Sequence, residues 1–240
     1  LLCKMGCYHC TKNNNGDNKH NNTNKKDDNR DCPYWKEEAV SILKWDKENK
    51  KWLQKDIGIG KLKDEFRGRF IYLFIGQNFG IRKRIERLIK AYSLLISERR
   101  EWKEKTHLHL HSLPISIQGI NLIKVIQDLG INDNVSFSYG TFGSSGWSEE
   151  GLNYIYNIAD VNVSASSSEG FGLGTLESMA CGKPNIGPDC SSFTELIGED
   201  EKTRRGLLAS ISDWQMIQDG SLRALVDERD LSLKMKMTYI

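Results

Sequence analysis

A strand followed at once by an amphipathic helix is the feature that most constrains how this chain can fold. Residues 70–76 (FIYLFIG) form a continuous apolar run, which is typical of a strand buried on both faces. Apolar residues then recur at helical spacing from Ile85 to Ile96. Because elements of these two kinds can bury their apolar faces against each other, the pair predicts an α/β domain.

The same alternation continues along the chain. Further strands are predicted at residues 106–111, 134–139, 161–165 and 184–187, and helices at residues 117–129, 148–158 and 173–181. A helical pattern also runs to the last residue, so we expect the domain to be truncated there. Repeated β-then-α units with short connections predict an α/β fold with a Rossmann-like parallel sheet and helices on both faces. In such sheets the ligand lies beyond the carboxyl ends of the strands.

The first 66 residues have a different character. Residues 11–31 contain eight Asn and no aliphatic or aromatic side chain, a composition that predicts a disordered linker. Residues 33–67 are charged and contain scattered Trp without a clear period, so we expect an ill-defined connector with at most a short helix. These patterns place a boundary near Arg67, between a segment at 1–66 and a domain at 67–240. Because the chain begins with Leu1 rather than Met, we expect a fragment at this end too.

Cysteines near the amino terminus leave several alternatives open. Three Cys between residues 3 and 10 have the CxxxCxxC spacing of a radical-SAM iron–sulfur motif, although no barrel pattern follows them. Cys32 with His9 or His20 would instead complete a zinc site. The third alternative is a set of free thiols in a frayed end.

Charge and hydropathy exclude several classes of protein. The chain has 34 Lys and Arg against 32 Asp and Glu, and its net charge of +2 is too small for a protein that wraps around nucleic acid. Its longest uncharged apolar stretches have only the length of strands, and no signal-peptide pattern opens the chain. We therefore expect no nucleic-acid partner, no transmembrane segment and a cytoplasmic location, with peripheral membrane contact left open.

A glycine-rich turn follows the strand that ends at Ala165. Residues 166–184 read SSSEGFGLGTLESMACGKP, which predicts a strand, a turn and the start of a helix. Missing Cβ atoms let a ligand approach the backbone there, and the N–H groups at a helix start attract anions. The turn alone is weak support for a phosphate site, because three Gly in five residues also suit a tight turn.

The longer string around this turn is more specific. EGFGLGTLESMACGKP, preceded by GWSEEGLNYIYNIADVNVSASS and followed by DCSSFTELI, resembles the signature segment of the family 4 glycosyltransferases, a group 1 family of the GT-B fold. The resemblance extends from about residue 70 to about residue 208. It implies that the chain is the carboxyl-terminal, nucleotide-sugar-binding domain of a retaining hexosyltransferase, which moves a sugar from a nucleoside diphosphate to an acceptor hydroxyl.

The resemblance also implies roles for individual residues. Glu169 would orient the donor sugar as a catalytic residue, and Glu177 would hold the ribose. The diphosphate would be received by the backbone amides of Gly170, Phe171, Gly172 and Leu173. Taken singly, the two glutamates are equally consistent with helix-start or solvent-facing charges.

The loop after the first strand of the domain carries a second part of the resemblance. Relatives have an Arg just after a Gly and a Lys six residues further on, both of which contact the diphosphate. Here Lys83 occupies the Lys position and is the second expected catalytic residue, whereas Gln77 occupies the Arg position and brings no charge. Arg82 or Arg84 is the expected substitute. The base would lie at the loop that begins with Tyr139 and Gly140.

Three histidines, His107, His109 and His111, alternate on one face of a predicted strand. No Cys or carboxylate is spaced to join them, so we expect no metal site there, although His111 stands where the strand meets the ligand cleft. The family resemblance implies no metal and no cofactor beyond the nucleotide-sugar donor.

The resemblance implies partners outside the chain as well. The acceptor, whether glycan, lipid or protein, would be presented by an amino-terminal GT-B domain that is missing from these residues. Two alternatives stay open: a nucleotide-sugar-binding module without transfer activity, and an epimerase-like or phosphorylase-like enzyme of the same fold.

Overall fold

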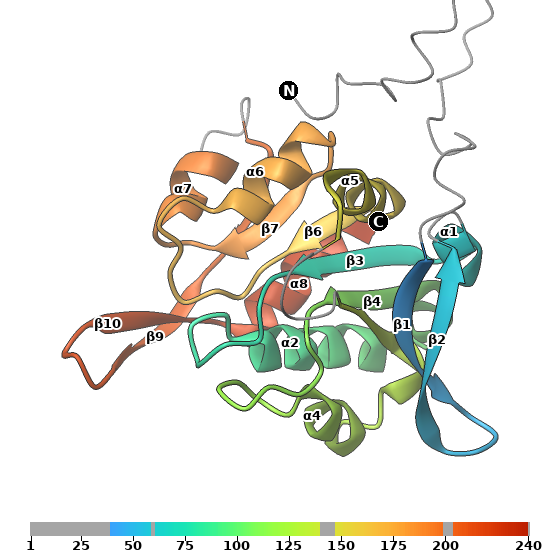
Figure 1. Cartoon of the computed structure of the whole chain (residues 1–240). Coiled ribbons are helices and arrows are strands. Elements are labelled where there is room, and N and C mark those ends of the chain that lie inside the picture. The colour runs from blue at the N-terminus through green and yellow to red at the C-terminus, as the bar shows by residue number, and fades with distance from the viewer. Residues whose placement is uncertain (1–38, 59–60, 140–146, 199–203, 240) are drawn as a thin grey trace, which may run out of the picture.

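The computed structural model describes residues 39–58, 61–139, 147–198 and 204–239. These residues form an eight-stranded sheet in the order β2-β1-β5-β4-β3-β6-β7-β8 (Figure 1). Parallel pairing joins β3 (Phe70–Ile75), β4 (Thr106–His111), β5 (Val135–Ser138), β6 (Val161–Val163), β7 (Asn185–Pro188) and β8 (Gly206–Ala209). Counted from β3, this is the doubly wound order 3-2-1-4-5-6. The prediction of a Rossmann-like sheet is therefore confirmed.

Helices connect these strands on both sides of the sheet. On the way to β4 and β5 the chain forms α2 (Ile85–Glu98), α3 (Arg100–Lys105), α4 (Leu122–Asp128) and the 3-10 helix η4 (Asn132–Asn134). It forms α5 (Glu149–Ile158) before β6, α6 (Leu173–Ala180) before β7 and α7 (Ser192–Ile197) before β8. The last helix, α8 (Glu228–Tyr239), follows all the strands. Ser148 caps α5 as expected of its position, since its hydroxyl accepts a hydrogen bond from the Gly151 N–H at 3.0 Å.

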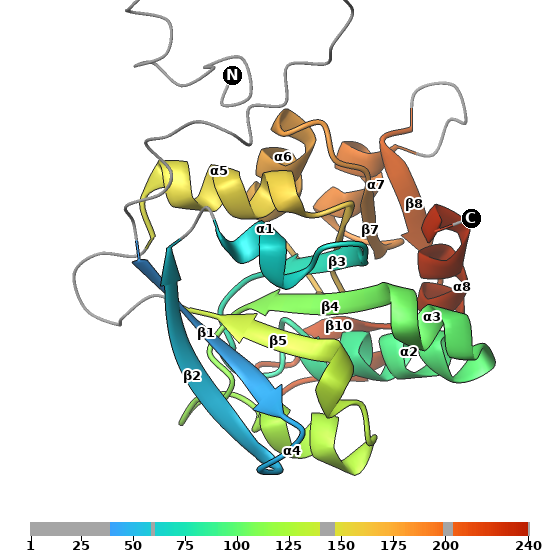
Figure 2. The same cartoon turned by 90° about the vertical axis from the view of Figure 1, so that its right-hand side faces the viewer.

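Strand β3 separates two apolar cores. Tyr72 and Phe74 pack with α2, α4 and α8, whereas Ile71 and Leu73 pack with α5 and with α1 (Leu62–Glu65). None of these four side chains is more than 2% exposed. Figure 2 shows the two helical layers on opposite sides of the strands. Cover on both faces is the reason that residues 70–76 are apolar without alternation.

The prediction of an ill-defined connector at residues 33–67 is wrong for residues 39–58. These residues form a hairpin of β1 (Ala39–Asp46) and β2 (Lys51–Gly58), and β1 pairs antiparallel with β5 at the edge of the sheet. Val40, Ile42 and Leu43 are buried. The ordered unit therefore continues on the amino-terminal side of Arg67, contrary to the predicted boundary. The predicted linker at 11–31 lies outside the described residues.

The expected helix at 117–129 begins later than its apolar pattern indicates. α4 starts at Leu122, after Asn121 accepts a hydrogen bond from the N–H of Lys124 at 3.0 Å. The side chain of Asn78 holds the preceding loop, because it donates to the carbonyl of Ile120 at 2.6 Å and accepts from its N–H at 2.9 Å. Capping and this contact keep residues 113–120 out of the helix.

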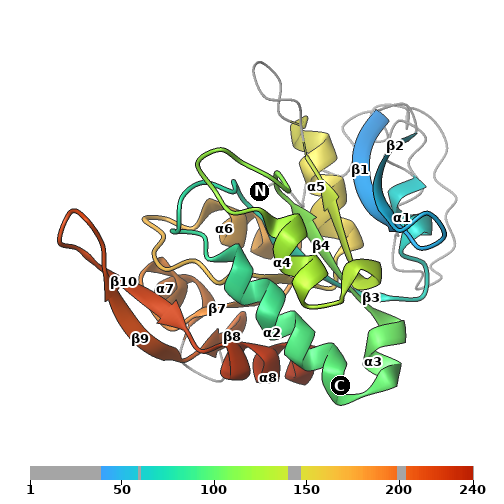
Figure 3. The ribbon, with the colours of Figure 1, turned by 90° about the horizontal axis from the view of Figure 1, so that it is seen from below.

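A second hairpin escapes prediction. β9 (Ile211–Met216) and β10 (Leu222–Val226) form a two-stranded sheet of their own, which projects from the domain (Figures 1 and 3). Most of its side chains are exposed or half-buried, so its sequence lacks the apolar alternation that identifies a covered strand.

Candidate functional site

The loops that follow the two central strands, β3 and β6, lie side by side. β3 and β6 are parallel neighbours at the point where the strand order reverses. The loop after β6 is fastened to the loop after β3 by Ser167, whose N–H and hydroxyl both donate to the carbonyl oxygen of Arg82, at 2.8 and 3.0 Å. Ligands of open α/β sheets bind at such a reversal, beyond the carboxyl ends of the strands.

Glu169 is the centre of the contacts between these loops. Its Oε1 accepts from Nζ of Lys83 at 2.5 Å and from the hydroxyl of Ser166 at 2.7 Å. Its Oε2 lies 2.9 Å from Nη1 of Arg82. The side chains of Glu169 and Lys83 are 14% and 19% exposed, whereas that of Arg82 is 46% exposed. The two expected catalytic residues are thus in contact, with Arg82 as a second, more accessible cation.

The electrostatics of this cluster keep Glu169 charged. Burial alone would raise the pKa of its carboxyl group. Hydrogen bonds from Lys83 and Ser166, together with the charges of Lys83 and Arg82, outweigh burial and lower the pKa below its ordinary value. The cluster therefore presents a carboxylate and two cations near neutral pH.

The start of α6 faces the same cluster. Gly172 precedes the helix with φ of 80°, and a Cβ at this position would lie 2.8 Å from Leu196, so only glycine fits. No side chain caps the first turn, which leaves its backbone N–H groups available to an anion. Phe171 and Leu173 are 61% and 63% exposed, and Gly170 is exposed beside them. Phe171, Gly172 and Leu173 line a pocket of about 310 Å³ together with Arg82, Lys83 and Glu169.

Glu177 lies further along α6 and faces α5. Its Oε2 accepts a hydrogen bond from the hydroxyl of Tyr156 at 2.7 Å. Burial, and then the Glu177 carboxylate, raise the pKa of Tyr156, so this phenol stays protonated and donates. Glu177 is half-buried and lines a cavity of about 100 Å³ with Leu152 and Tyr156. It does not line the pocket that contains Glu169.

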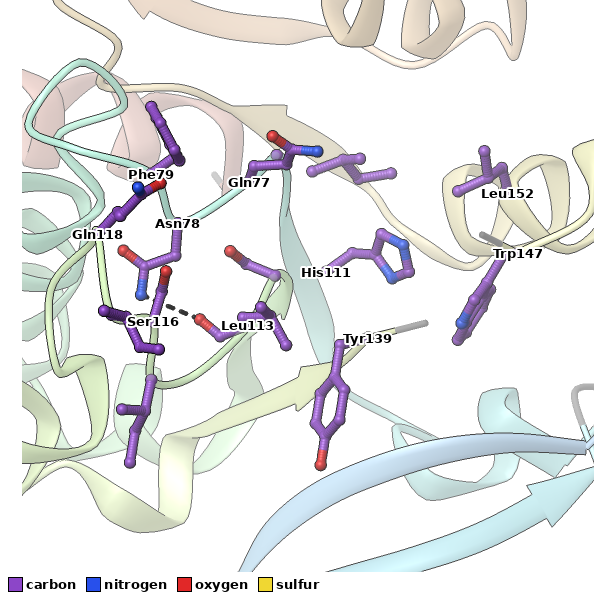
Figure 4. Close-up of a pocket in the computed structure, with 15 residues that line it drawn as sticks. Gln77, Asn78, Phe79, His111, Leu113, Ser116, Gln118, Tyr139, Trp147 and Leu152 are labelled. Carbon is purple, nitrogen blue, oxygen red and sulfur yellow. Dashed lines mark hydrogen bonds between the residues drawn. The ribbon is translucent and has the colours of Figure 1, made fainter. Parts of the chain in front are cut away.

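A larger pocket, of about 840 Å³, opens beyond the ends of β3, β4 and β5. Figure 4 shows Gln77, His111, Tyr139 and Trp147 around it, with the loop held by Asn78 on one side. None of the described residues that line it is charged. Tyr139 lines this pocket, whereas Gly140 is outside the described residues.

Several expectations are corrected or narrowed by this arrangement. Gln77 is exposed and lines the uncharged pocket, so it is not part of the Glu169 cluster. Arg84 is outside the Glu169 cluster: its backbone is left-handed (φ 48°), and its guanidinium donates to the side-chain oxygen of Gln215 in β9. Arg82 is the cation that reaches the cluster.

The expected absence of a metal site and of a transmembrane helix can be compared only with the described part of the chain. In that part no group of three His, Cys, Asp or Glu residues is arranged to hold a metal ion. His107, His109 and His111 instead hydrogen-bond to serines of β5. No helix within the described ranges combines the length and apolar character needed to cross a membrane. The cysteines at residues 3–32 lie outside these ranges.

Two parts of the site escape sequence reasoning. Trp147 packs against His111 with ring centroids 4.7 Å apart, although nothing in its spacing indicates this contact. The serines of β5 that bond to the histidines do have a signal, because Ser136 and Ser138 alternate on their strand just as the histidines do on β4. Two alternating polar sets on adjacent strands predict contact.

Comparison with known proteins gives relatives of one kind. Residues 61–239 match the model of the family described as glycosyl transferases group 1. A serotype-specific mannosyltransferase WbdA of Escherichia coli is 30% identical over 147 residues, which cover 61% of this chain and 16% of that protein. The O-antigen chain mannosyltransferase B of Escherichia coli is 30% identical over 155 residues, covering 61% of this chain and 35% of its own length. The chain thus spans only a minor part of these relatives.

Solved structures show the same fold. WaaG, a glycosyltransferase of lipopolysaccharide biosynthesis, aligns with a TM-score of 0.54 and 17% identity over 74% of this chain and 40% of its own. The sucrose-phosphate synthase of Thermosynechococcus elongatus aligns with a TM-score of 0.55 and 23% identity over 75% of this chain and 38% of its own. Since the family model covers most of the described fold, this chain belongs to the glycosyl transferases group 1 family and has the carboxyl-terminal domain of a GT-B glycosyltransferase.

Proposed function

We propose that this chain is the donor-binding half of a retaining glycosyltransferase that moves a hexosyl group from a nucleoside-diphosphate sugar to an acceptor hydroxyl. One observation carries the proposal: Lys83, Arg82 and Glu169 meet the uncapped, glycine-rich start of α6 at the reversal of the strand order. Cations and backbone N–H groups recognise phosphate, and a carboxylate recognises sugar hydroxyls. The pocket combines the groups that the sugar-diphosphate end of such a donor requires.

The chemistry assigned to these groups is electrostatic. The bond between the anomeric carbon and the diphosphate oxygen breaks, and the electron pair leaves on that oxygen. The oxygen of the acceptor hydroxyl forms the new bond to the anomeric carbon, and its proton passes to the departing diphosphate. Lys83, Arg82 and the amino-terminal end of α6 stabilise the negative charge that develops there. Glu169 accepts hydrogen bonds from sugar hydroxyls and holds the ring in place. Retention of configuration rests on the family resemblance, and the proposal assigns no side-chain nucleophile and no metal ion.

The nucleoside is assigned to the other side of the site. Glu177 uses one carboxylate oxygen for Tyr156, and a carboxylate has further lone pairs that can accept both ribose hydroxyls. Leu152 lines both the small cavity at Glu177 and the 840 Å³ pocket, which connects the proposed ribose and base positions. Tyr139 and Trp147 give this pocket aromatic walls suited to a planar base.

The acceptor side is assigned to a second Rossmann-like domain outside these 240 residues. The curated relatives are much longer than their matched parts, and their names describe mannosyl transfer. A hexose such as mannose is therefore the favoured donor sugar. The acceptor would be a glycan, lipid or protein hydroxyl, in a reaction at the cytoplasmic side of the cell.

Binding of nucleotides tests the assignment of Glu177. Calorimetric titration of Glu177→Ala with a nucleoside monophosphate and with the diphosphate should show both ligands weakened by about 1–3 kcal/mol, because both contain the ribose. Glu195→Ala, which removes an exposed carboxylate on α7, is the matched control and should bind as the unaltered chain does. Unchanged dissociation constants for Glu177→Ala would remove this residue from the site.

Turnover tests the division of labour between domains. The purified chain should bind nucleotide sugars but show no acceptor-dependent release of nucleoside diphosphate, because orientation of the acceptor is lost without the second domain. Addition of that domain should restore release, and a chelator should leave the restored rate unchanged. Robust transfer by the 240 residues alone would contradict this division, and loss of activity with chelator would contradict the metal-free assignment.

A further inference from the structure

A row of alternating histidines and serines is buried between β4 and β5. Nε2 of His107 and Nδ1 of His109 lie 2.8 and 2.9 Å from the hydroxyl of Ser136. Nε2 of His109 and Nδ1 of His111 lie 2.8 and 2.9 Å from the hydroxyl of Ser138. His107, His109 and both serines are at most 1% exposed, and Phe66 covers the row with its ring. We call these five residues the His–Ser ladder.

Arg69 gives the ladder a direction. Its Nη1 lies 3.2 Å from Nδ1 of His107 at the end of the ladder that is far from the pocket. A guanidinium can only donate hydrogen bonds, so Nδ1 of His107 must accept. In a neutral imidazole the proton is then on Nε2, which donates to Ser136.

Each following step is fixed by the need to satisfy buried groups. The Ser136 hydroxyl accepts from His107, and its own proton has Nδ1 of His109 as its acceptor. Nε2–H of His109 then donates to Ser138, whose proton goes to Nδ1 of His111. The reverse order would also satisfy both hydroxyls, but it would put a proton on Nδ1 of His107, against the guanidinium of Arg69. With His107 set by Arg69, any other order leaves a buried hydroxyl proton without an acceptor. The remaining proton of the ladder is on Nε2 of His111.

Burial keeps the ladder neutral, as this order requires. It lowers the pKa of His109 to about 3 and that of His111 to about 4, and it also lowers the pKa of His107. Lys44 and Arg69 lie close enough to disfavour a further positive charge on the row. The three rings therefore act as hydrogen-bond relays near neutral pH and carry no charge.

His111 brings the last donor to the wall of the 840 Å³ pocket. Its ring is half-buried beside Trp147 and close to Gln77 and Tyr139 (Figure 4), and its Nε2 has no hydrogen-bond partner within the described ranges. A donor whose tautomer is fixed from the far end of the ladder cannot turn into an acceptor, unlike an isolated histidine or a flexible amide.

We propose that the His–Ser ladder makes His111 Nε2–H a fixed donor that selects nucleobases with an exocyclic carbonyl oxygen, uracil and guanine, over those with an amino group in that place, cytosine and adenine. This inference rests on the proposed function, because it assigns the base of a nucleotide sugar to this pocket. A carbonyl oxygen of the base accepts a hydrogen bond from Nε2–H of His111. An exocyclic amino group in the same place would face this N–H as a second donor, and no hydrogen bond would form.

Tautomers can be read directly in solution. Long-range proton–nitrogen correlation spectra of the ¹⁵N-labelled full chain at pH 7 should show three neutral histidines with the proton on Nε2, beside the signals of His9 and His20. His111→Gln identifies the signal of His111. A proton on Nδ1 of His111, or a charged ring, would overturn the ladder's direction whether or not any nucleotide binds.

Nucleotide preference tests the consequence. UDP and CDP are a matched pair, and the unaltered chain should bind UDP about tenfold more tightly, the worth of one well-placed hydrogen bond. Ser138 lies outside the pocket lining, so Ser138→Ala removes the group that fixes His111, and the acceptor of His109 Nε2–H with it, while the lining is left as it is. The ratio should then fall to about one, since a free imidazole adapts to either base, whereas Ser97→Ala on the exposed end of α2 should leave it unchanged.

Two variants of His111 keep the test informative if Ser138→Ala does not fold. His111→Leu should remove the preference for UDP because the donor is lost, and His111→Gln should also bind UDP and CDP about equally, because its flexible amide can either donate or accept. A preference for UDP that persists in His111→Leu, or equal binding of UDP and CDP by the unaltered chain, would overturn the inference. A chain that binds no nucleoside diphosphate at all would instead refute the proposed function, while the tautomer spectra still decide the ladder.

Discussion

The two pockets at the carboxyl edge of the sheet differ most in charge. The 310 Å³ pocket has Lys83 and Arg82 against the carboxylate of Glu169 and the uncapped start of α6. The described lining of the 840 Å³ pocket has no charged residue and consists of amides, serines, aliphatic side chains, aromatic rings and a neutral imidazole. One sheet edge thus supports a strongly ionic environment beside a neutral one.

The difference follows from which strands end at each pocket. The loops after β3 and β6 bring opposite charges together, and their pairing offsets the cost of partial burial. His111 and Tyr139 lie at the ends of β4 and β5, and each makes a neutral hydrogen bond, through Nδ1 in His111 and through the hydroxyl in Tyr139. A ligand that spans both pockets would have a charged middle and an uncharged ring, as a nucleotide sugar has.

The largest effect is expected from removing the best-buried cation. Lys83→Ala should weaken binding of nucleoside diphosphate by about 2–3 kcal/mol, or roughly 30- to 160-fold, because a charge-assisted hydrogen bond to the outer phosphate is lost. The monophosphate, which lacks that phosphate, should lose much less. Titration calorimetry with both ligands measures the difference.

Two further variants make this test specific to the ionic pocket. Lys103→Ala removes an exposed lysine of α3 and should change neither constant. Lys83→Arg should recover only part of the affinity, since a planar fork places its donors differently from a compact ammonium. Equal losses for monophosphate and diphosphate would place Lys83 away from the outer phosphate.

Acid should separate the His–Ser ladder behind the neutral pocket from the cluster in the ionic pocket. His109 in the unfolded chain takes up a proton below its ordinary pKa of 6.5, whereas the folded chain keeps it neutral down to about 3. The unfolded state binds more protons in this window, so stability falls as the pH falls, by about 2 kcal/mol at pH 5 for this residue. Glu169 has a lowered pKa, and its contribution is lost only further down, below its ordinary value of 4.5.

Urea unfolding at pH 7 and pH 5 measures this separation. His109→Gln cannot titrate, so its unfolding free energy should change less between the two pH values than that of the unaltered chain. Glu169→Gln should leave the change between pH 7 and pH 5 almost as it is. The same pH dependence in His109→Gln as in the unaltered chain would show that this imidazole is not held neutral by burial.

The same comparison explains how much of the fold could be predicted. Strands that are covered on both faces, such as residues 70–76, can be recognised by their apolar runs, and for this reason the sequence predicts the doubly wound sheet. The two hairpins do not, because β2 and β9 are largely exposed and their residues follow no period. Trp45 and Trp52, which pair across β1 and β2 at 5.9 Å, read as scattered aromatics until the register is known.

The ionic pocket was easier to predict than the neutral one. The family resemblance assigned Lys83 and Glu169 to one donor site, because each lies in a motif that is continuous in the sequence. The choice between Arg82 and Arg84 could not, because it depends on the left-handed backbone of Arg84 at the start of α2. The His–Ser ladder depends on the register of β4 against β5, which no local pattern fixes.

A smaller effect of opposite sign is expected at Glu169. Its carboxylate occupies both Lys83 and Arg82, so Glu169→Gln should release these cations and tighten binding of free nucleoside diphosphate by about 1 kcal/mol, or fivefold. Transfer by the two-domain enzyme should nevertheless fall, because an amide holds sugar hydroxyls less strongly than a carboxylate. Tighter diphosphate binding with slower turnover is the pattern to measure. Weaker binding of both nucleotide and nucleotide sugar would mean that Glu169 positions Lys83 for the phosphate.

The smallest effect is expected from adding charge to the neutral pocket. Gln77 is exposed at the border of the 840 Å³ pocket, in the position where relatives have an Arg. Gln77→Arg should tighten diphosphate binding by only about 0.5 kcal/mol, because an exposed cation is screened by water and salt. Gln77→Met, which has a similar length and no charge, is the matched control and should give no gain. Titration at low and high salt measures the gain, which should disappear in 0.5 M salt because the added charge is solvated. A gain of tenfold or more that survives high salt would mean that the Gln77 side chain reaches the phosphates directly, and that the boundary between the ionic and neutral pockets lies further toward His111.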